Sequence, residues 1–171
     1  GTICGSSDAI IQHCMRCDPM SHYTHTHRHN DVRDAIAKVV RSYGIPVTTE
    51  PRFYANCYET LSDQRPDITF HTNPKIATDV TIVSQDGDVG CAAHEAATVK
   101  KRIHTTAVAT LGHLFVPFAM EVFGHRDKSC FDLVRAIMTS IPDHLHRQFV
   151  FDMHHGVSTA LAAARATSLI S

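Results

Sequence analysis

Hydrophobic residues follow two spacings along this chain, and together they predict a mixture of helices and strands. Hydrophobic residues at helical spacing predict helices over 30–43, 89–109, 129–140 and 142–169. Short apolar and β-branched runs predict strands over 45–50, 65–70, 76–83 and 114–123. In the last strand Pro117 favours an edge position or a bulge, because proline has no N–H to donate. The order helix, strand, strand, strand, helix, strand predicts an α/β fold with a mixed sheet flanked by helices.

Composition alone does not indicate one class of function. The chain has 171 residues, which suits one domain with a hydrophobic core, or one domain with a small appendage. The net charge of −1 does not by itself indicate a nucleic-acid binder, although local patches matter more than totals. Six scattered cysteines and the lack of a signal or membrane-spanning pattern favour a reduced intracellular compartment such as the nucleus, with no membrane partner.

Two carboxylates stand inside adjacent predicted strands. Asp67 and Asp79 interrupt apolar, β-branched runs, where a charge is costly unless it is paired or binds a metal. Lys100 and Lys101 follow on a predicted helix. Two acids that hold Mg²⁺ or Mn²⁺, with a lysine that stabilises developing charge, can hydrolyse phosphodiesters. The alternatives are that Asp67 is a turn cap, that Asp79 pairs with a lysine, and that both lysines lie on a solvated helix face.

Cysteine and histidine cluster between residues 14 and 29. A Cys-x-x-Cys pair followed by histidines predicts a zinc knuckle, because Zn²⁺ takes four nitrogen or sulfur ligands. The predicted ligands are Cys14, Cys17, His22 and His27. His25 is the second choice among the histidines, and the alternative is a redox pair or two incidental thiols in a histidine-rich loop.

The order of elements, with acids on the second and third strands, resembles the restriction-endonuclease-like, PD-(D/E)XK fold. A (K/R)PD…D signature marks the endonuclease domains of site-specific non-LTR retrotransposons, and the chain resembles it at Arg65-Pro66-Asp67 and Asp79. The resemblance extends to segments before and after this signature. Before it lie the Cys14-x-x-Cys17 knuckle, Arg28-His29-Asn30 with Arg33 at a helix start, and Glu50 after the first strand. After it lie Lys100 on a helix, and Phe115-Val116-Pro117-Phe118, Glu121 and Phe123-Gly124 in the later strand.

This resemblance implies roles for further residues. Glu50 would complete the metal site or be a plain surface acid, and Glu121 could brace the site. Contacts to DNA are expected from Arg28, His29, Asn30, Arg33, Lys101 and Arg102. For His29, Asn30 and Arg33 the alternatives are that they orient the acids, or that they only cap a helix and add surface charge. Lys101 is the rival of Lys100 for the catalytic role.

The resemblance also implies a domain division and a function. Residues 1–29 would form an N-terminal segment with the knuckle at 14–29, and residues 30–171 the restriction-endonuclease-like domain. The implied activity is target-site nicking of DNA for retrotransposition, with Mg²⁺ or Mn²⁺ at the catalytic site and structural Zn²⁺. RNA or a reverse transcriptase domain of the same polyprotein would be further partners. The alternatives are a catalytically silent module that serves a larger assembly as a structural or nucleic-acid-binding subunit, and a purely zinc-binding protein.

Overall fold

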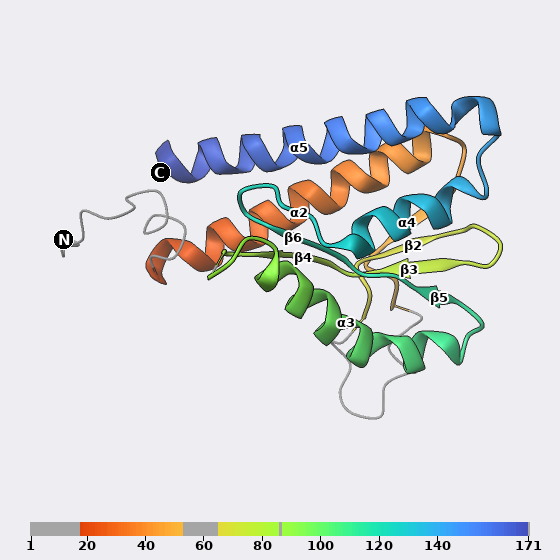
Figure 1. Cartoon of the computed structure of the whole chain (residues 1–171), viewed down its shortest axis with the longest axis horizontal. Helices are drawn as coiled ribbons and strands as arrows, with labels where there is room; N and C mark the ends of the chain where they lie inside the picture. The colour runs from red at the N-terminus through yellow and green to blue at the C-terminus, as the bar shows by residue number, and fades with distance from the viewer. Residues whose placement is uncertain (1–17, 53–64, 86, 171) are drawn as a thin grey trace.

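The chain folds as a small mixed α/β structure in which helices flank the strands, as the sequence pattern predicts (Figure 1). The computed structural model describes residues 18–52, 65–85 and 87–170, and the side chains of 25–52, 65–85 and 87–166. In chain order the elements are α2 (Asp18–Ser42), β1 (Val47–Thr49), β2 (Ile68–Phe70), β3 (Ile76–Thr78), β4 (Val80–Val83), α3 (Cys91–Ala109), β5 (Leu114–Phe115), β6 (Phe118–Glu121), α4 (Lys128–Met138), a 3-10 turn η2 (Asp143–Leu145) and α5 (His146–Ile170).

The strands form an antiparallel meander that is extended by a parallel crossover. β1, β2 and β3 pair antiparallel in that order, and β5 pairs parallel with β3. Past Asp79 the chain continues as β4, which pairs parallel with β6. Helix α3 makes the connection from β4 to β5. The predicted strand over 114–123 is divided between β5 and β6, and Pro117 lies in the break between them, neither in an edge strand nor at a described bulge.

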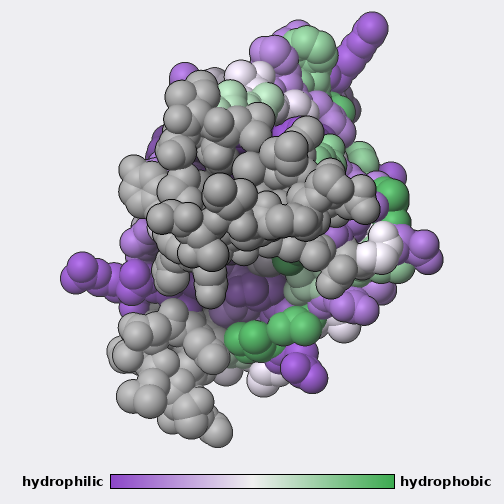
Figure 2. Space-filling model, turned by 90° about the vertical axis from the view of Figure 1, so that its left-hand side faces the viewer, coloured by the Kyte–Doolittle hydropathy of each residue, from purple (hydrophilic) through white to green (hydrophobic). Residues whose placement is uncertain are grey.

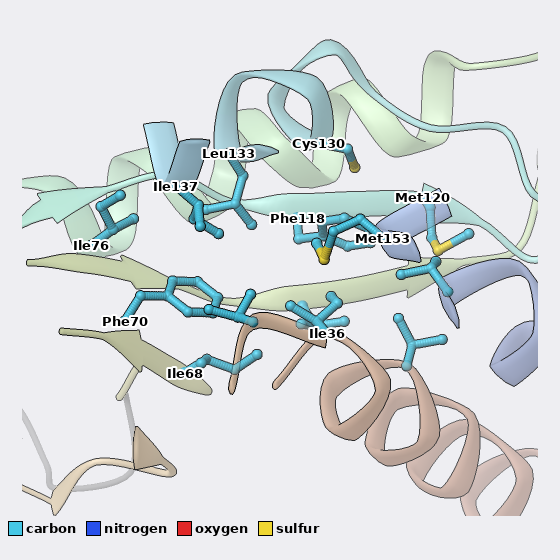
Figure 3. Close-up of a cluster of buried hydrophobic side chains, with 14 of the residues drawn as sticks. Ile36, Ile68, Phe70, Ile76, Phe118, Met120, Cys130, Leu133, Ile137 and Met153 are labelled. Atoms are coloured by element: carbon cyan, nitrogen blue, oxygen red, sulfur yellow. The ribbon is translucent and has the colours of Figure 1, made fainter. Parts of the chain in front are cut away.

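The main hydrophobic core lies between the strands and helices α2, α4 and α5 (Figure 3). It includes Ile36, Leu133 and Met153 from the three helices, all buried. Burying a side chain of this size stabilises the fold by about 1.5–3 kcal/mol. α3 covers the opposite face, where a smaller cluster contains Ala77 and Phe115. The strands therefore have one face on the main core and the other face toward α3.

Helix α2 starts earlier than the sequence pattern predicts. The expected start was residue 30, but α2 begins at Asp18 and runs to Ser42, so the predicted boundary between 29 and 30 falls inside one helix. Pro19 in the first turn is a helix-start signal that the hydrophobic pattern does not reveal, because proline has no N–H that would need a partner there.

Helix α5 packs closely along α2, as its many alanines predict. A Cβ atom on Gly156 would come within 3.1 Å of Val39 Cγ2, so a small residue permits this approach. Among the described residues no helix is both long and apolar enough to cross a bilayer. The described residues visible in Figure 2 are mostly hydrophilic, with smaller hydrophobic areas between them.

Candidate functional site

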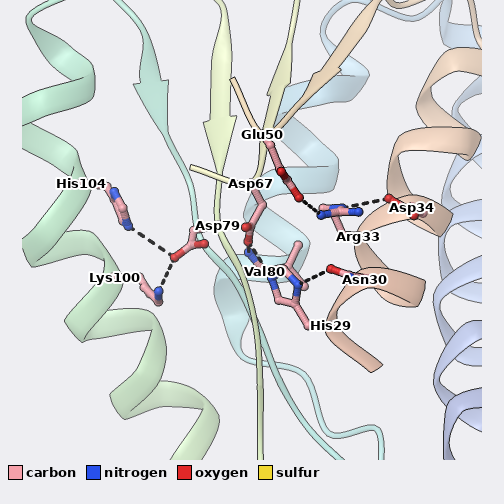
Figure 4. Close-up of polar contacts among 10 residues, drawn as sticks. All are labelled: His29, Asn30, Arg33, Asp34, Glu50, Asp67, Asp79, Val80, Lys100 and His104. Carbon is pink, nitrogen blue, oxygen red and sulfur yellow. Dashed lines mark hydrogen bonds and ion pairs between the residues drawn. The ribbon is translucent and has the colours of Figure 1, made fainter. Parts of the chain in front are cut away.

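Asp67 directly precedes β2 and Asp79 directly follows the antiparallel strand β3 (Figure 4). Ile68 of β2 pairs with Thr78 of β3, and extending this register by one residue sets Asp67 opposite Asp79. Residues opposite each other in antiparallel strands point to the same face. Ile68 and Val80 belong to the main core. Asp79 contacts Lys100 and His104 of α3, and Asp67 contacts His29 of α2. The strand register is thus what brings the two carboxylates together.

Each carboxylate has its own set of partners. Asp67 Oδ2 accepts the backbone N–H of Val80 at 2.7 Å and contacts His29 Nε2 at 2.9 Å. Asp79 Oδ2 lies 2.5 Å from Lys100 Nζ and 3.3 Å from His104 Nε2. The side chains of Asp67 and Asp79 are only 17% and 6% exposed. Two largely buried acids are therefore matched by cationic or protonatable groups from helices α2 and α3.

His29 completes a group that could hold a metal ion. One of its ring nitrogens and one oxygen each of Asp67 and Asp79 all lie within 4.8 Å of one another. In the described part of the chain this is the one such group of histidine, cysteine and acidic side chains. It opens into a pocket of about 380 Å³, whose wall also includes Lys100 and Thr81. The pocket gives a ligand access to the acids from outside.

The environment moves the pKa values of the two acids apart. Burial raises the pKa of Asp67 to about 6, and the nearby Asp79 adds to this rise while His29 opposes it. Burial would also raise the pKa of Asp79, but hydrogen bonds with His104 and Asp67 and the charge of Lys100 hold it well below its usual range. For His29, burial lowers the pKa, yet the contact with Asp67 outweighs burial and the net pKa is raised. Above about pH 6 two negative charges face one another in this site.

Glu50 and Glu121 do not join this group. The carboxylate of Glu50 pairs with Arg33 Nη1 at 2.5 Å and with Arg65 Nη2 at 3.5 Å. Glu50 is therefore neutralised by two arginines at the sheet end and is not brought to the acid pair. Glu121 is buried and accepts the N–H of Gly90 at 2.8 Å, which places it at the start of α3.

The residues expected to contact DNA fall into different environments. Arg28 is only 2% exposed, so the expectation that it meets phosphate does not agree with its buried position. Arg33 is occupied by Asp34 and Glu50. Lys101 and Arg102 are exposed on α3, where they are free to meet an anionic ligand.

Only some of the proposed zinc ligands lie within the described residues. Cys14, Cys17 and the side chain of His22 lie outside the described residues. The backbone of His22 and His27 belongs to α2. The zinc site at these residues stays a prediction. His25 lies four residues before His29 and lines the same pocket as the acids.

His104 is the site residue that sequence reasoning missed as a contributor. It is 3% exposed, contacts Asp79, and packs against Phe115 with ring centroids 4.9 Å apart. Its position four residues after Lys100 was a usable signal, because residues at that spacing share one helix face. The same spacing explains why Lys100 and not Lys101 reaches Asp79.

A scan against protein-family models finds no match for the chain, and no curated protein matches it significantly. The fold and the site together define the class: a mixed α/β chain in which two carboxylates meet a histidine from α2 and a lysine from α3.

Proposed function

We propose that the chain is a metal-dependent DNA endonuclease that hydrolyses a phosphodiester bond at the Asp67–Asp79 pair. The observation that carries this proposal is the convergence of two buried carboxylates with Lys100 at the wall of an open pocket. A purely structural pair of acids does not require a pocket, and it does not require a lysine that is 32% exposed at the pocket wall.

The arrangement of elements supports the same class. A helix precedes an antiparallel three-strand meander, and a helical crossover then leads to a strand parallel to the third. We assign this order to the restriction-endonuclease-like fold, in which the acids occupy the second and third strands.

The residues present fit a hard divalent cation. Mg²⁺ is usually bound through one or two carboxylates, and it keeps several waters and substrate phosphates as its other ligands. Asp67 and Asp79 would supply these two carboxylates. The metal, when bound, would polarise the scissile phosphate and lower the pKa of a bound water.

The chain's own residues would divide the remaining work. The N–H of Val80 holds Asp67 Oδ2 in place, and His104 holds Asp79 from the α3 side. Lys100 would stabilise negative charge on the phosphate in the transition state, which such preorganised cations do most effectively in a poorly hydrated site. Lys101 and Arg102, exposed on the same helix, would contact neighbouring phosphates of the DNA.

The biological setting is proposed from the motif resemblance. The chain would nick a target site, and the freed 3′-hydroxyl would prime reverse transcription by a domain of the same polyprotein, within the nucleus. The cysteines and histidines near the start would hold a structural zinc ion.

The test is nicking of supercoiled plasmid with Mg²⁺ or Mn²⁺ by wild type, Asp79→Asn and Asp31→Asn. Asp31 is an exposed acid on α2 and serves as the matched control. The proposal expects nicking by wild type and Asp31→Asn and none by Asp79→Asn. Equal nicking by all three would exclude the acid pair as the site. No nicking by a folded, metal-binding wild type would favour the catalytically silent module.

A further inference from the structure

We propose that His29 is itself a ligand of the metal, through Nε2, and that the site therefore prefers a first-row transition cation such as Mn²⁺ over Mg²⁺. The inference rests on the proposed function only in placing a metal at Asp67 and Asp79. It adds a nitrogen ligand to that site and names the cation that such a ligand set selects.

The first support is distance. A ring nitrogen of His29 lies within 4.8 Å of a carboxylate oxygen on both Asp67 and Asp79, and His29 Nε2 lies 2.9 Å from Asp67 Oδ2. Ligands around an octahedral ion with bonds of about 2.1 Å lie roughly 3 Å apart when adjacent and roughly 4 Å apart when opposite. A small contraction of the three side chains around a cation would meet these distances.

The second support is the orientation of the ring. His29 Nδ1 lies 3.2 Å from Asn30 Oδ1, while Nε2 faces the acids. Metal-binding histidines typically donate their second ring N–H to an oxygen, which fixes the tautomer and the ring orientation. Asn30 is placed to do this, so the opposite nitrogen would be the one presented to a cation.

The third support is the hydrogen bonding of the two carboxylate oxygens of Asp67. Asp67 Oδ2 already accepts the N–H of Val80 in addition to contacting His29. The other oxygen of Asp67 has neither of these contacts. A cation between Asp67 Oδ1, one oxygen of Asp79 and His29 Nε2 would leave the Val80 hydrogen bond intact. The contact between His29 and Asp67 would then be exchanged for two bonds to the same ion.

The choice of cation follows from ligand chemistry. Carboxylate oxygens suit Mg²⁺, Ca²⁺ and Mn²⁺, whereas imidazole nitrogen suits later first-row metals such as Fe²⁺, Ni²⁺ and Zn²⁺. Two carboxylates with one imidazole therefore favour a first-row transition cation, of which Mn²⁺ is the one that also suits the carboxylates. This ligand set discriminates against Mg²⁺, which also dehydrates reluctantly.

The test uses Mn²⁺ alone as the probe, bound to the full chain without an affinity tag. Electron spin-echo envelope modulation detects nitrogen bonded directly to Mn²⁺, and ¹⁵N-labelled histidine identifies its source. Wild type should show a histidine coupling, His29→Gln should lose it, and His144→Gln, a change at an exposed histidine outside the acid-pair site, should keep it. Competition with Mg²⁺ should show that the preference for Mn²⁺ falls about 10-fold or more in His29→Gln.

The outcomes separate this inference from the proposed function. Mn²⁺ that binds wild type and is lost in Asp79→Asn, but shows no histidine coupling, would overturn the role of His29 and leave the acid-pair site standing. Wild type that binds no Mn²⁺ would overturn both. Because the wild-type spectrum alone decides whether nitrogen is bound, the result does not depend on the folding of the His29 variant.

Discussion

Asparagine in place of Asp67 should make the metal-free protein more stable at pH 7. The carboxylate of Asp67 is 17% exposed and faces Asp79, whose pKa is held low, so both are ionised at this pH. Asparagine keeps an oxygen that can accept the N–H of Val80, which now bonds Asp67 Oδ2 at 2.7 Å. The substitution therefore removes a buried charge that also faces Asp79, and it keeps the main hydrogen bond.

The size of the effect follows from the pKa of Asp67. Its rise from 3.8 to about 6 means that ionising this group costs more in the folded chain than in the unfolded chain. At about 1.4 kcal/mol per pKa unit, the cost at pH 7 is at most about 3 kcal/mol. The variant also loses the ionic contact with His29 and buries an amide. We therefore expect a gain in unfolding free energy of about 1–3 kcal/mol.

The stability difference between Asp67→Asn and wild type should depend on pH in a defined direction. The folded pKa of Asp67 lies above the unfolded value, so folded wild type binds the proton more tightly than the unfolded chain does. Wild type then gains stability relative to the variant as the pH falls from 7 through 6 toward 4. The advantage of Asp67→Asn should be largest at pH 7 and should shrink at pH 5.

The assay is urea unfolding at pH 7 and pH 5 after dialysis without added divalent cations, with Asp31→Asn as the control. Added Mn²⁺ should stabilise wild type and leave Asp67→Asn nearly unchanged, because a ligand that binds only the folded state adds stability. An Asp67→Asn variant that is less stable than wild type by the same amount at both pH values would refute the reasoning. Asp67 would then be a structural residue and not half of a strained acid pair.

Three further predictions concern other parts of the chain. Lys100→Met should slow the rate of single-turnover plasmid nicking by about 10²-fold or more. Lys101→Met, at an exposed neighbouring position, should change this rate only a few-fold. The reverse result would assign the catalytic role to Lys101. Asp127 accepts the N–H of Ser129 at 2.8 Å and so caps the start of α4. Asp127→Ala should lower the free energy of unfolding in urea by about 1 kcal/mol, and Asp127→Asn should lower it less. Equal losses in the two variants would argue against capping. Native mass spectrometry should find about one zinc ion per chain, and chelation should lower the melting temperature; protein purified without chelators and found to contain no zinc would exclude the zinc knuckle.

The meeting of the two acids could be predicted from sequence because it depends on local pattern. A single carboxylate in each of two short apolar strands, joined by a short connection, is enough to expect an antiparallel pair. The pairing of Ile68 with Thr78 supplies the register that brings Asp67 and Asp79 opposite each other. Sequence alone could suggest this convergence, but it could not fix the register.

The contacts around the acids depend on packing between elements that are distant in sequence, so they are harder to predict from sequence. The sequence predicts Arg28 on a basic helix surface, yet Arg28 is buried in the folded chain. Glu50 is expected from sequence either in the metal site or as a surface acid, and in the fold its carboxylate pairs with Arg33 and Arg65. His29 was expected at DNA or beside the acids, and only the packing of α2 on the strands decides that it contacts Asp67.

The most direct test of the central claim is a crystal structure of the wild-type chain soaked in Mn²⁺, with anomalous diffraction to locate the ion. The account predicts a peak bonded to one oxygen of Asp67 and one oxygen of Asp79, with no such peak in Asp79→Asn. Asp67 and Asp79 well ordered in the crystal, with Lys100 still on Asp79 and no Mn²⁺ between the two acids, would contradict the claim that this pair is a metal site.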